Sequence, residues 1–292
     1  MTTMIYDWPT TFTRSSRRRF TALVLKLAKH RQLNFVGEIP LLTLENGAVM
    51  NLCNLINECA AMPETIWQQR IEQWFDVITT SMRLSVEGDG LSPEVARASL
   101  RIRLLPLGLP ECSVTRPSFP GLVAALFIVR TGYGQHVIEE NLESWGLDRE
   151  EAFAVALLNT FEHEKVQHFE RDGMSAIDGG SNYASTHALF LRPEKPYIVG
   201  IPTRNFVVRQ ELEHLGGAIA DVMIETLLRY NEGPGSTTNL IWFVDPATIN
   251  IWGEGAELVD VRIWQDKNGQ PDCRINNGPR LDKHLEYLAS LQ

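Results

Sequence analysis

Tyr197-Ile198-Val199-Gly200-Ile201 and Phe206-Val207-Val208 are two apolar runs separated by Pro202-Thr203-Arg204-Asn205. Proline and asparagine favour turns, whereas β-branched and aromatic residues favour strands, so the pattern predicts a β-hairpin. Gly216-Gly217 then precedes a helical pattern in which apolar residues recur every four positions. Residues 197–230 therefore predict a hairpin followed by an amphipathic helix.

The same order of strands and helix recurs twice earlier in the chain. Residues 41–50 carry Asn46-Gly47 between two apolar runs, a strong hairpin signal, and a helical pattern follows from Pro63. Residues 122–138 form a long apolar run with a short return. Asp148, with Glu151 three positions later, then predicts a capped helix start.

The late chain adds further hairpins. The expected strand pairs are Leu240–Val244 with Ile249–Trp252, and Val259–Trp264 with Asp272–Ile275, before a short helix carrying Leu281, Leu285 and Leu288. Because hairpins dominate, we expect an α+β fold with mainly antiparallel sheets. Its hairpin-then-helix units would place the helices on one face and end in extra C-terminal hairpins.

The distribution of prolines and polar residues predicts the domain organisation. Residues 1–16 are polar and predict a flexible arm. Residues 17–110 predict an N-terminal hairpin-helix module, and residues 121–292 a C-terminal α+β module. The segment 112–120, with two prolines, is the expected connector. One continuous domain over 17–292 is the alternative.

Composition favours a globular cytoplasmic protein. The 292 residues are 44% hydrophobic and 22% charged, and the net charge of −9 disfavours nucleic acid as a partner. The four cysteines are scattered, with no C-x-x-C pair, which indicates reduced thiols.

The basic segment 17–31 has two further interpretations. Ser16-Arg17-Arg18-Arg19-Phe20 looks like a twin-arginine export signal, but Lys26 and Lys29 interrupt the apolar run that such a signal needs. An amphipathic basic helix explains the segment better, and a membrane-associated protein anchored by residues 17–31 is a third alternative.

We expect no metal, no cofactor and no catalytic constellation. The densest group of possible metal ligands is Glu162-His163-Glu164-Lys165-Val166-Gln167-His168. Its histidines are five positions apart, about 140° around a helix, which is too far for one ion. Glu164 and His168 could pair at i, i+4, and the segment is interpreted as the polar end of a helix. Nucleophile-elbow and phosphate-loop motifs are absent from the sequence.

Two segments are candidate binding sites. Residues 178–187 are rich in hydroxyl groups, and the expected loop would present Tyr183, Ser185 and His187 to a ligand or partner. Arg204 and Asn205 lie at the expected hairpin tip, where the arginine could bind a carboxylate. The alternative is an ordinary connection and a solvated turn.

Two functions from different classes fit these features. The first is a non-enzymatic protein-binding module, such as an adaptor, chaperone or immunity-type inhibitor, whose partner has a basic surface attracted by the acidic chain. Trp242, Trp252 and Trp264 on the late strands would form its flat aromatic surface. The alternative is a hydrolase or small-ligand-binding enzyme that uses residues 178–187 with Arg204.

Several short segments resemble the YtpQ-like family of uncharacterised bacterial proteins. They are residues 47–52, 103–106, 125–161, and 181–185 followed by 200–205. The resemblance implies a bacterial, cytosolic protein and brings no activity with it. Its matched positions include Tyr183, Ser185, Arg204 and Asn205. The likeness weakens after Gly253, which leaves the role of residues 254–292 open.

Overall fold

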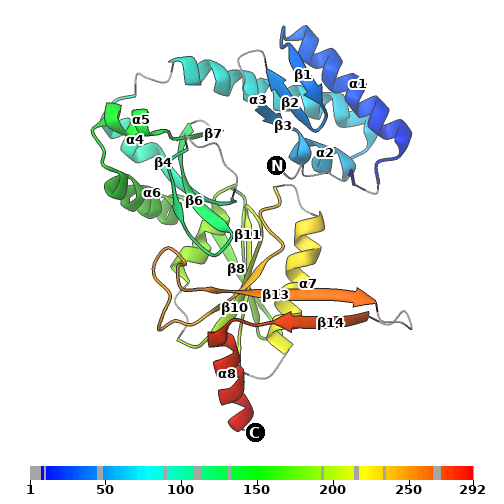
Figure 1. Cartoon of the computed structure of the whole chain (residues 1–292). Helices are drawn as coiled ribbons and strands as arrows, with labels where there is room; N and C mark the ends of the chain where they lie inside the picture. The colour runs from blue at the N-terminus through cyan, green and yellow to red at the C-terminus, as the bar shows by residue number, and fades with distance from the viewer. Residues whose placement is uncertain are drawn as a thin grey trace. The chain divides into compact units, whose positions relative to one another are not determined.

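The computed structural model has an α+β fold with antiparallel sheets (Figure 1). It describes residues 8–9, 11–44, 49–87, 91–107, 113–130, 133–191, 194–213, 217–232, 235–265 and 271–291. The chain divides into two compact units. The first comprises Met1–Gly88 with Glu232–Pro234, and the second comprises Asp89–Asn231 with Gly235–Gln292.

The first unit packs helices around a small antiparallel sheet of order β1-β2-β3. Its elements are α1 (Arg14–His30), β1 (Phe35–Glu38), β2 (Leu41–Leu44), β3 (Val49–Asn51), α2 (Cys53–Ala60), the 3₁₀ turn η1 (Glu64–Ile66) and α3 (Trp67–Glu87). The pairing of β2 with β3 confirms the first predicted hairpin. Its Asn46-Gly47 turn lies outside the described residues.

The predicted flexible arm 1–16 differs from the structure where it is described. Helix α1 already begins at Arg14, and the Thr13 hydroxyl accepts a hydrogen bond from the Ser16 backbone N–H. Phe12 is buried, with its ring stacked on Trp67 at a centroid distance of 4.9 Å. The apolar area of this aromatic side chain outweighs the polar character of its neighbours.

The second unit is built on a seven-stranded sheet of order β14-β13-β12-β10-β11-β9-β8, antiparallel throughout (Figure 1). Its strands are β8 (Val166–Arg171), β9 (Met174–Gly179), β10 (Tyr197–Thr203), β11 (Phe206–Glu211), β12 (Ile241–Val244), β13 (Glu257–Gln265) and β14 (Pro271–Asn276). The β10–β11 and β13–β14 hairpins confirm two predictions.

The two faces of this sheet pack against different elements. Helices α7 (Gly217–Glu232) and α8 (Pro279–Ser290) pack on the face that carries Ile198 and Val208. The other face carries Val199 and Trp242, which share a core with a second, four-stranded sheet. The elements of this layer are α4 (Pro93–Ser99), β4 (Leu100–Pro106), β5 (Thr115–Pro117), β6 (Leu122–Arg130), β7 (Tyr133–His136), α5 (Glu139–Trp145) and α6 (Arg149–His163). The predicted cap of α6 is present, because the Asp148 carboxylate accepts the Glu151 N–H at 2.8 Å.

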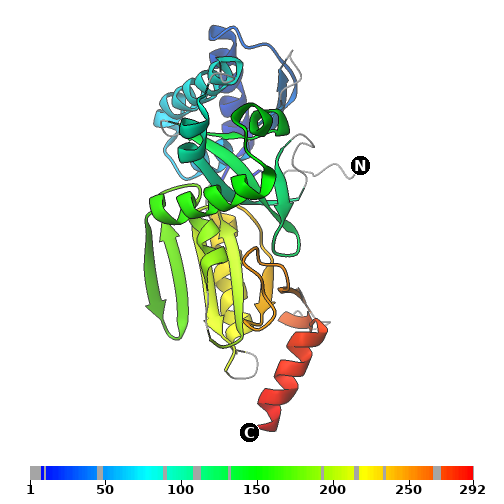
Figure 2. The same cartoon turned by 90° about the vertical axis from the view of Figure 1, so that its left-hand side faces the viewer.

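Two secondary-structure predictions are wrong. Residues 162–168 are not one helix end, because α6 stops at His163 and β8 starts at Val166 as an edge strand of the main sheet (Figure 2). Residues 249–252 form irregular backbone and a turn instead of a strand. Strand β12 pairs with β10 on one side and with β13 on the other. Both of its edges are therefore occupied, and residues 249–252 have no edge of β12 to pair with.

The predicted module boundary also differs from the structure. Strand β4 pairs along its whole length with β6, which places residues 100–106 in the second unit. The expected connector 112–120 contains β5, which is a strand of the same sheet. The first unit therefore ends at Gly88 and not at the predicted boundary between residues 110 and 121, because residues 100–106 pair with a strand of the second unit.

Candidate functional site

The outer face of the four-stranded sheet carries a cluster of cationic and aromatic side chains. Alternation along β4 turns Leu100, Ile102 and Leu104 into the core, so Arg101 and Arg103 project from the opposite face. In the register, Arg101 lies opposite Phe127, and Phe127 lies opposite His136. Three adjacent strands thus supply one row of functional side chains.

Tyr183 closes over this row from the turn after β9, immediately before the 3₁₀ helix η3 (Ala184–Phe190). Its ring meets Phe127 edge-on, with centroids 5.8 Å apart. The Arg103 guanidinium lies 4.6 Å from the Phe127 centroid and 4.7 Å from that of Tyr183, so cation–π contacts hold it between the two rings. We call Arg101, Arg103, Phe127, His136 and Tyr183 the arginine–tyrosine site.

Several polar atoms of the arginine–tyrosine site have no partner within the described residues. Arg103 donates from Nε to the Asn182 carbonyl at 3.0 Å, and neither terminal nitrogen has an acceptor there. The Tyr183 hydroxyl and Nδ1 of His136 are buried without a hydrogen bond. Buried polar atoms are nearly always satisfied, so these groups have the capacity to bind a further molecule.

Gly134 makes room for the tyrosine. A Cβ at position 134 would lie 1.7 Å from the Tyr183 hydroxyl oxygen. The glycine therefore permits the close approach of the phenol to the β7 backbone, two residues before His136.

The electrostatics keep the site cationic while its phenol and imidazole stay neutral. Burial raises the pKa of Tyr183, whereas the charges of Arg103, Arg101 and Arg204 oppose that shift and Glu164 adds to it. Burial, assisted by the Arg103 charge, lowers the pKa of His136 to about 4. Glu164 pairs with Arg101 at 3.5 Å. Three arginines and one carboxylate thus surround a phenol that can donate a hydrogen bond.

The predicted binding loop 178–187 is wrong as an exposed loop. Tyr183, Ser185 and His187 are all buried, and the last two lie within η3. The Ser185 N–H donates to the Arg204 carbonyl at 3.0 Å, while Nε2 of His187 lies 3.2 Å from the Glu164 carbonyl. The hydroxyl-rich sequence forms a compact turn packed between two sheets, so these side chains are buried and do not project from an exposed loop.

Arg204 and Asn205 do form the hairpin tip, as predicted. Asn205 ties the tip to its neighbours, because it accepts the Thr203 hydroxyl at 2.9 Å and donates toward Asp178 at 3.4 Å. The Arg204 side chain passes Gly235, where a Cβ would lie 2.4 Å from Nε. The side-chain hydrogen bonds of Asn205 thus stabilise the hairpin tip. The charge of Arg204 acts on Tyr183, whose pKa it lowers.

A small cleft of about 320 Å³ adjoins Glu164. Its lining residues are Phe161, Glu164, Val166, His168, Ile177, His187, Phe190 and Leu191. Phe161 and Phe190 have ring centroids 4.7 Å apart, and burial lowers the pKa of His187, partly opposed by its hydrogen bond to the Glu164 backbone. This cleft offers mainly apolar and aromatic contacts.

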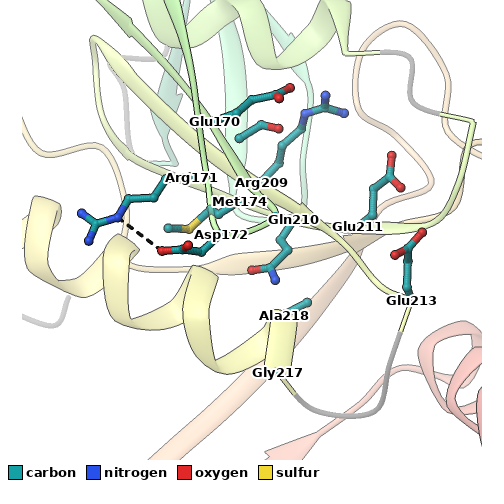
Figure 3. Close-up of a pocket in the computed structure, with 12 residues that line it drawn as sticks. Glu170, Arg171, Asp172, Met174, Arg209, Gln210, Glu211, Glu213, Gly217 and Ala218 are labelled. Atoms are coloured by element: carbon teal, nitrogen blue, oxygen red, sulfur yellow. Dashed lines mark hydrogen bonds and ion pairs between the residues drawn. The ribbon is translucent and has the colours of Figure 1, made fainter.

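A larger hollow of about 710 Å³ lies between the β8–β9 turn, β11 and the start of α7 (Figure 3). Arg171 and Asp172 pair at 3.3 Å and are both largely exposed, while Glu211 and Glu213 lie across the hollow from them (Figure 3). Charges of both signs line this hollow, and its Arg171 is paired and largely exposed, whereas Arg103 is held between two aromatic rings. The arginine–tyrosine site is therefore the better candidate.

The described residues contain neither a candidate metal cluster nor a candidate membrane span. There, no group of three or more histidine, cysteine, aspartate or glutamate side chains could hold a metal ion. The predicted i, i+4 pairing of Glu164 and His168 is wrong, since one residue follows α6 and the other lies in β8. Within the same residues, no helix combines the length and apolar character needed to cross a bilayer.

The predicted aromatic surface is not formed by the late tryptophans that the structure describes. Trp242 is fully buried, and its indole N–H donates to the Pro120 carbonyl at 2.9 Å. Trp252 is also buried, beneath Arg116. The Trp264 side chain lies outside the described residues.

Comparisons of the chain with protein-family models, curated proteins and solved structures found no match. The resemblance to the YtpQ-like family therefore stays a prediction.

The sequence interpretation missed Arg101, Arg103 and His136. Residues 100–105 read Leu-Arg-Ile-Arg-Leu-Leu, so two arginines alternate with apolar residues inside a strand. That alternation indicates a face that is not core, and it is the signal from which Arg101 and Arg103 could have been found.

Stability is expected to fall as the pH drops from about 6.5 toward 4, because His136 is neutral in the fold and its unfolded form binds a proton more readily. The loss attributable to this residue is about 3 kcal/mol when the pH reaches its folded-state pKa. Denaturant titrations at several pH values would measure it. His136→Gln should flatten the profile relative to the exposed control His163→Gln; parallel profiles for the two variants would contradict the prediction.

Proposed function

We propose that this chain is a non-enzymatic binding protein that captures an anionic group, a carboxylate or a phosphate, at the arginine–tyrosine site. The observation that carries the proposal is the Arg103 guanidinium, held between two aromatic rings with both terminal nitrogens unpartnered in the described part of the chain. A guanidinium presents parallel N–H donors that match the oxygens of such groups.

The neighbouring groups support an anionic ligand. The raised pKa of Tyr183 keeps its phenol protonated, so the hydroxyl can donate. Arg101 and Arg204 add positive charge, which Glu164 only partly offsets. Donors placed in advance around a half-buried cation bind an anion with little reorganisation.

The chemistry around the predicted residues favours binding over catalysis. The Ser185 hydroxyl is buried and has no hydrogen-bond partner among the described residues, so none of them is placed to activate it as a nucleophile. Binding of a protein with a basic surface stays a prediction from the net charge of −9, since the described tryptophans that suggested a contact surface are buried.

Inorganic phosphate and acetate are the probes that test the proposal. Protein-dependent broadening of the phosphate line in phosphorus NMR, and of the carboxyl line of labelled acetate in carbon NMR, separates the two sources of anionic oxygen. Arg103→Lys should raise the Kd of the bound probe about tenfold, because it keeps the charge but loses a donor fork worth about 1.5 kcal/mol or more. Tyr183→Phe should weaken binding about threefold by removing one hydroxyl donor.

Arg171→Lys is the matched control, because its side chain is exposed on the β8–β9 turn. It should leave the Kd unchanged. If neither probe binds the intact chain, or if Arg103→Lys and Arg171→Lys bind equally well, the arginine–tyrosine site is not an anion site.

A further inference from the structure

Helix α1 concentrates positive charge in an acidic chain. Residues 8–37 contain seven lysines and arginines and no aspartate or glutamate, although the whole chain has a net charge of −9. This segregation is independent of the arginine–tyrosine site, because α1 belongs to the first unit.

Three of the seven cations have partners within their own unit. Arg19 pairs with Glu64 at 2.8 Å and Arg31 with Asp76 at 2.6 Å. Arg17 donates to the Phe12 carbonyl at 3.2 Å. The remaining four are Arg14, Arg18, Lys26 and Lys29, and none of them has an acidic partner among the described residues.

These four side chains share the exposed face of α1. The opposite face carries Phe20, Val24 and Leu27, which are buried in the core of the first unit. At 100° and 1.5 Å per residue, positions 14, 18, 26 and 29 span an arc of about 120° and a length of about 22 Å. We call this face, with the four cations on it, the α1 basic face.

Leu25 interrupts the α1 basic face with an apolar side chain that is 48% exposed. The phosphodiester backbone of a nucleic acid has no apolar surface on which Leu25 could pack. The boundary between lipid headgroups and acyl chains does provide such a surface. Because the four cations lie on one exposed side of the helix, all of them can contact the phosphate groups of a flat surface together.

We infer that the α1 basic face docks the first unit onto an anionic phospholipid surface. Attraction is electrostatic and reversible, because the apolar face of the helix is already used in the core and cannot insert. The remainder of the chain carries a net negative charge that the same surface repels, so the charge distribution favours contact through α1.

Vesicle co-sedimentation with the full chain tests this inference. The chain should bind phosphatidylcholine vesicles containing about 30% phosphatidylglycerol at about 0.1 M salt, lose that binding at about 0.5 M, and ignore pure phosphatidylcholine. Replacing Arg14, Arg18, Lys26 and Lys29 together by glutamine should weaken binding at least about tenfold, since each cation contributes to the attraction.

The control carries the same number of substitutions in the second unit, at Lys165, Arg171, Lys195 and Lys283, all of them exposed. It should bind as the unmodified chain does, and circular dichroism should show that both variants are folded. Equal losses in the two variants, equal binding to neutral vesicles, or tighter binding to a short duplex DNA at the same salt would each overturn the inference.

Discussion

Gly200→Ala should destabilise the second unit by about 3 kcal/mol, at the upper end of the usual range for overpacking. Gly200 lies in β10, whose two neighbours in the sheet are β11 and β12. Alternation along β10 turns position 200 toward α7, and a Cβ there would lie 1.9 Å from Oγ1 of Thr226. The helix crosses the sheet at this point because glycine leaves room for it.

A second substitution tests whether that clash is the cause. Thr226 is buried and its hydroxyl has no hydrogen-bond partner in the described part of the chain, so Thr226→Ala alone should cost little. The double variant should regain most of the stability, because the hydroxyl nearest to the new Cβ is gone. Free energies of unfolding from denaturant titrations give the coupling. Additive losses in the double variant would show that the strain lies in the β10 backbone instead.

Local signals predicted those parts of the fold that depend on neighbours in sequence. The Asp148 cap of α6 and the β10–β11 hairpin rest on turn and cap chemistry within a few residues, and both are present. Residues 166–171 carried no such signal, because β8 is an exposed edge strand whose polar sequence follows directly on a helix. Within the described residues its only strand partner is β9, and its side chains are mostly exposed, so no apolar pattern is required of its sequence.

The remaining differences between the predicted and the observed structure depend on partners that are distant in sequence. Residues 249–252 are apolar enough for a strand, but β12 already has β10 and β13 on its two sides. The arginine–tyrosine site combines β4, the β6–β7 hairpin and the turn before η3, where Asn182 lies 79 residues after Arg103. Tyr183 was predicted from its own segment, whereas Arg103 becomes a candidate only when β4 pairs with β6 and its guanidinium comes to lie over the Phe127 ring.

The N-terminal segment gives the second large stability effect. Phe12→Ala should destabilise the first unit by about 3–5 kcal/mol, the usual cost of truncating a buried phenylalanine. Phe12 is 3% exposed and packs against Trp8, Phe20 and Trp67, with centroid distances of 5.3, 5.8 and 4.9 Å. Its removal leaves a cavity between rings that are held by α1 and α3, which cannot collapse without moving a helix.

Hydrogen exchange in the full chain separates this effect from global unfolding. Peptides from α1 and α3 should lose protection in Phe12→Ala, while peptides from β10 and β12 keep theirs, because the two units have separate cores. Thr11→Ala is the matched control, since Thr11 is exposed and precedes the phenylalanine directly. If Phe12→Ala exchanges like this control, residues 11–13 contribute nothing to the core, and the flexible arm expected from composition describes the protein better than the packed segment does.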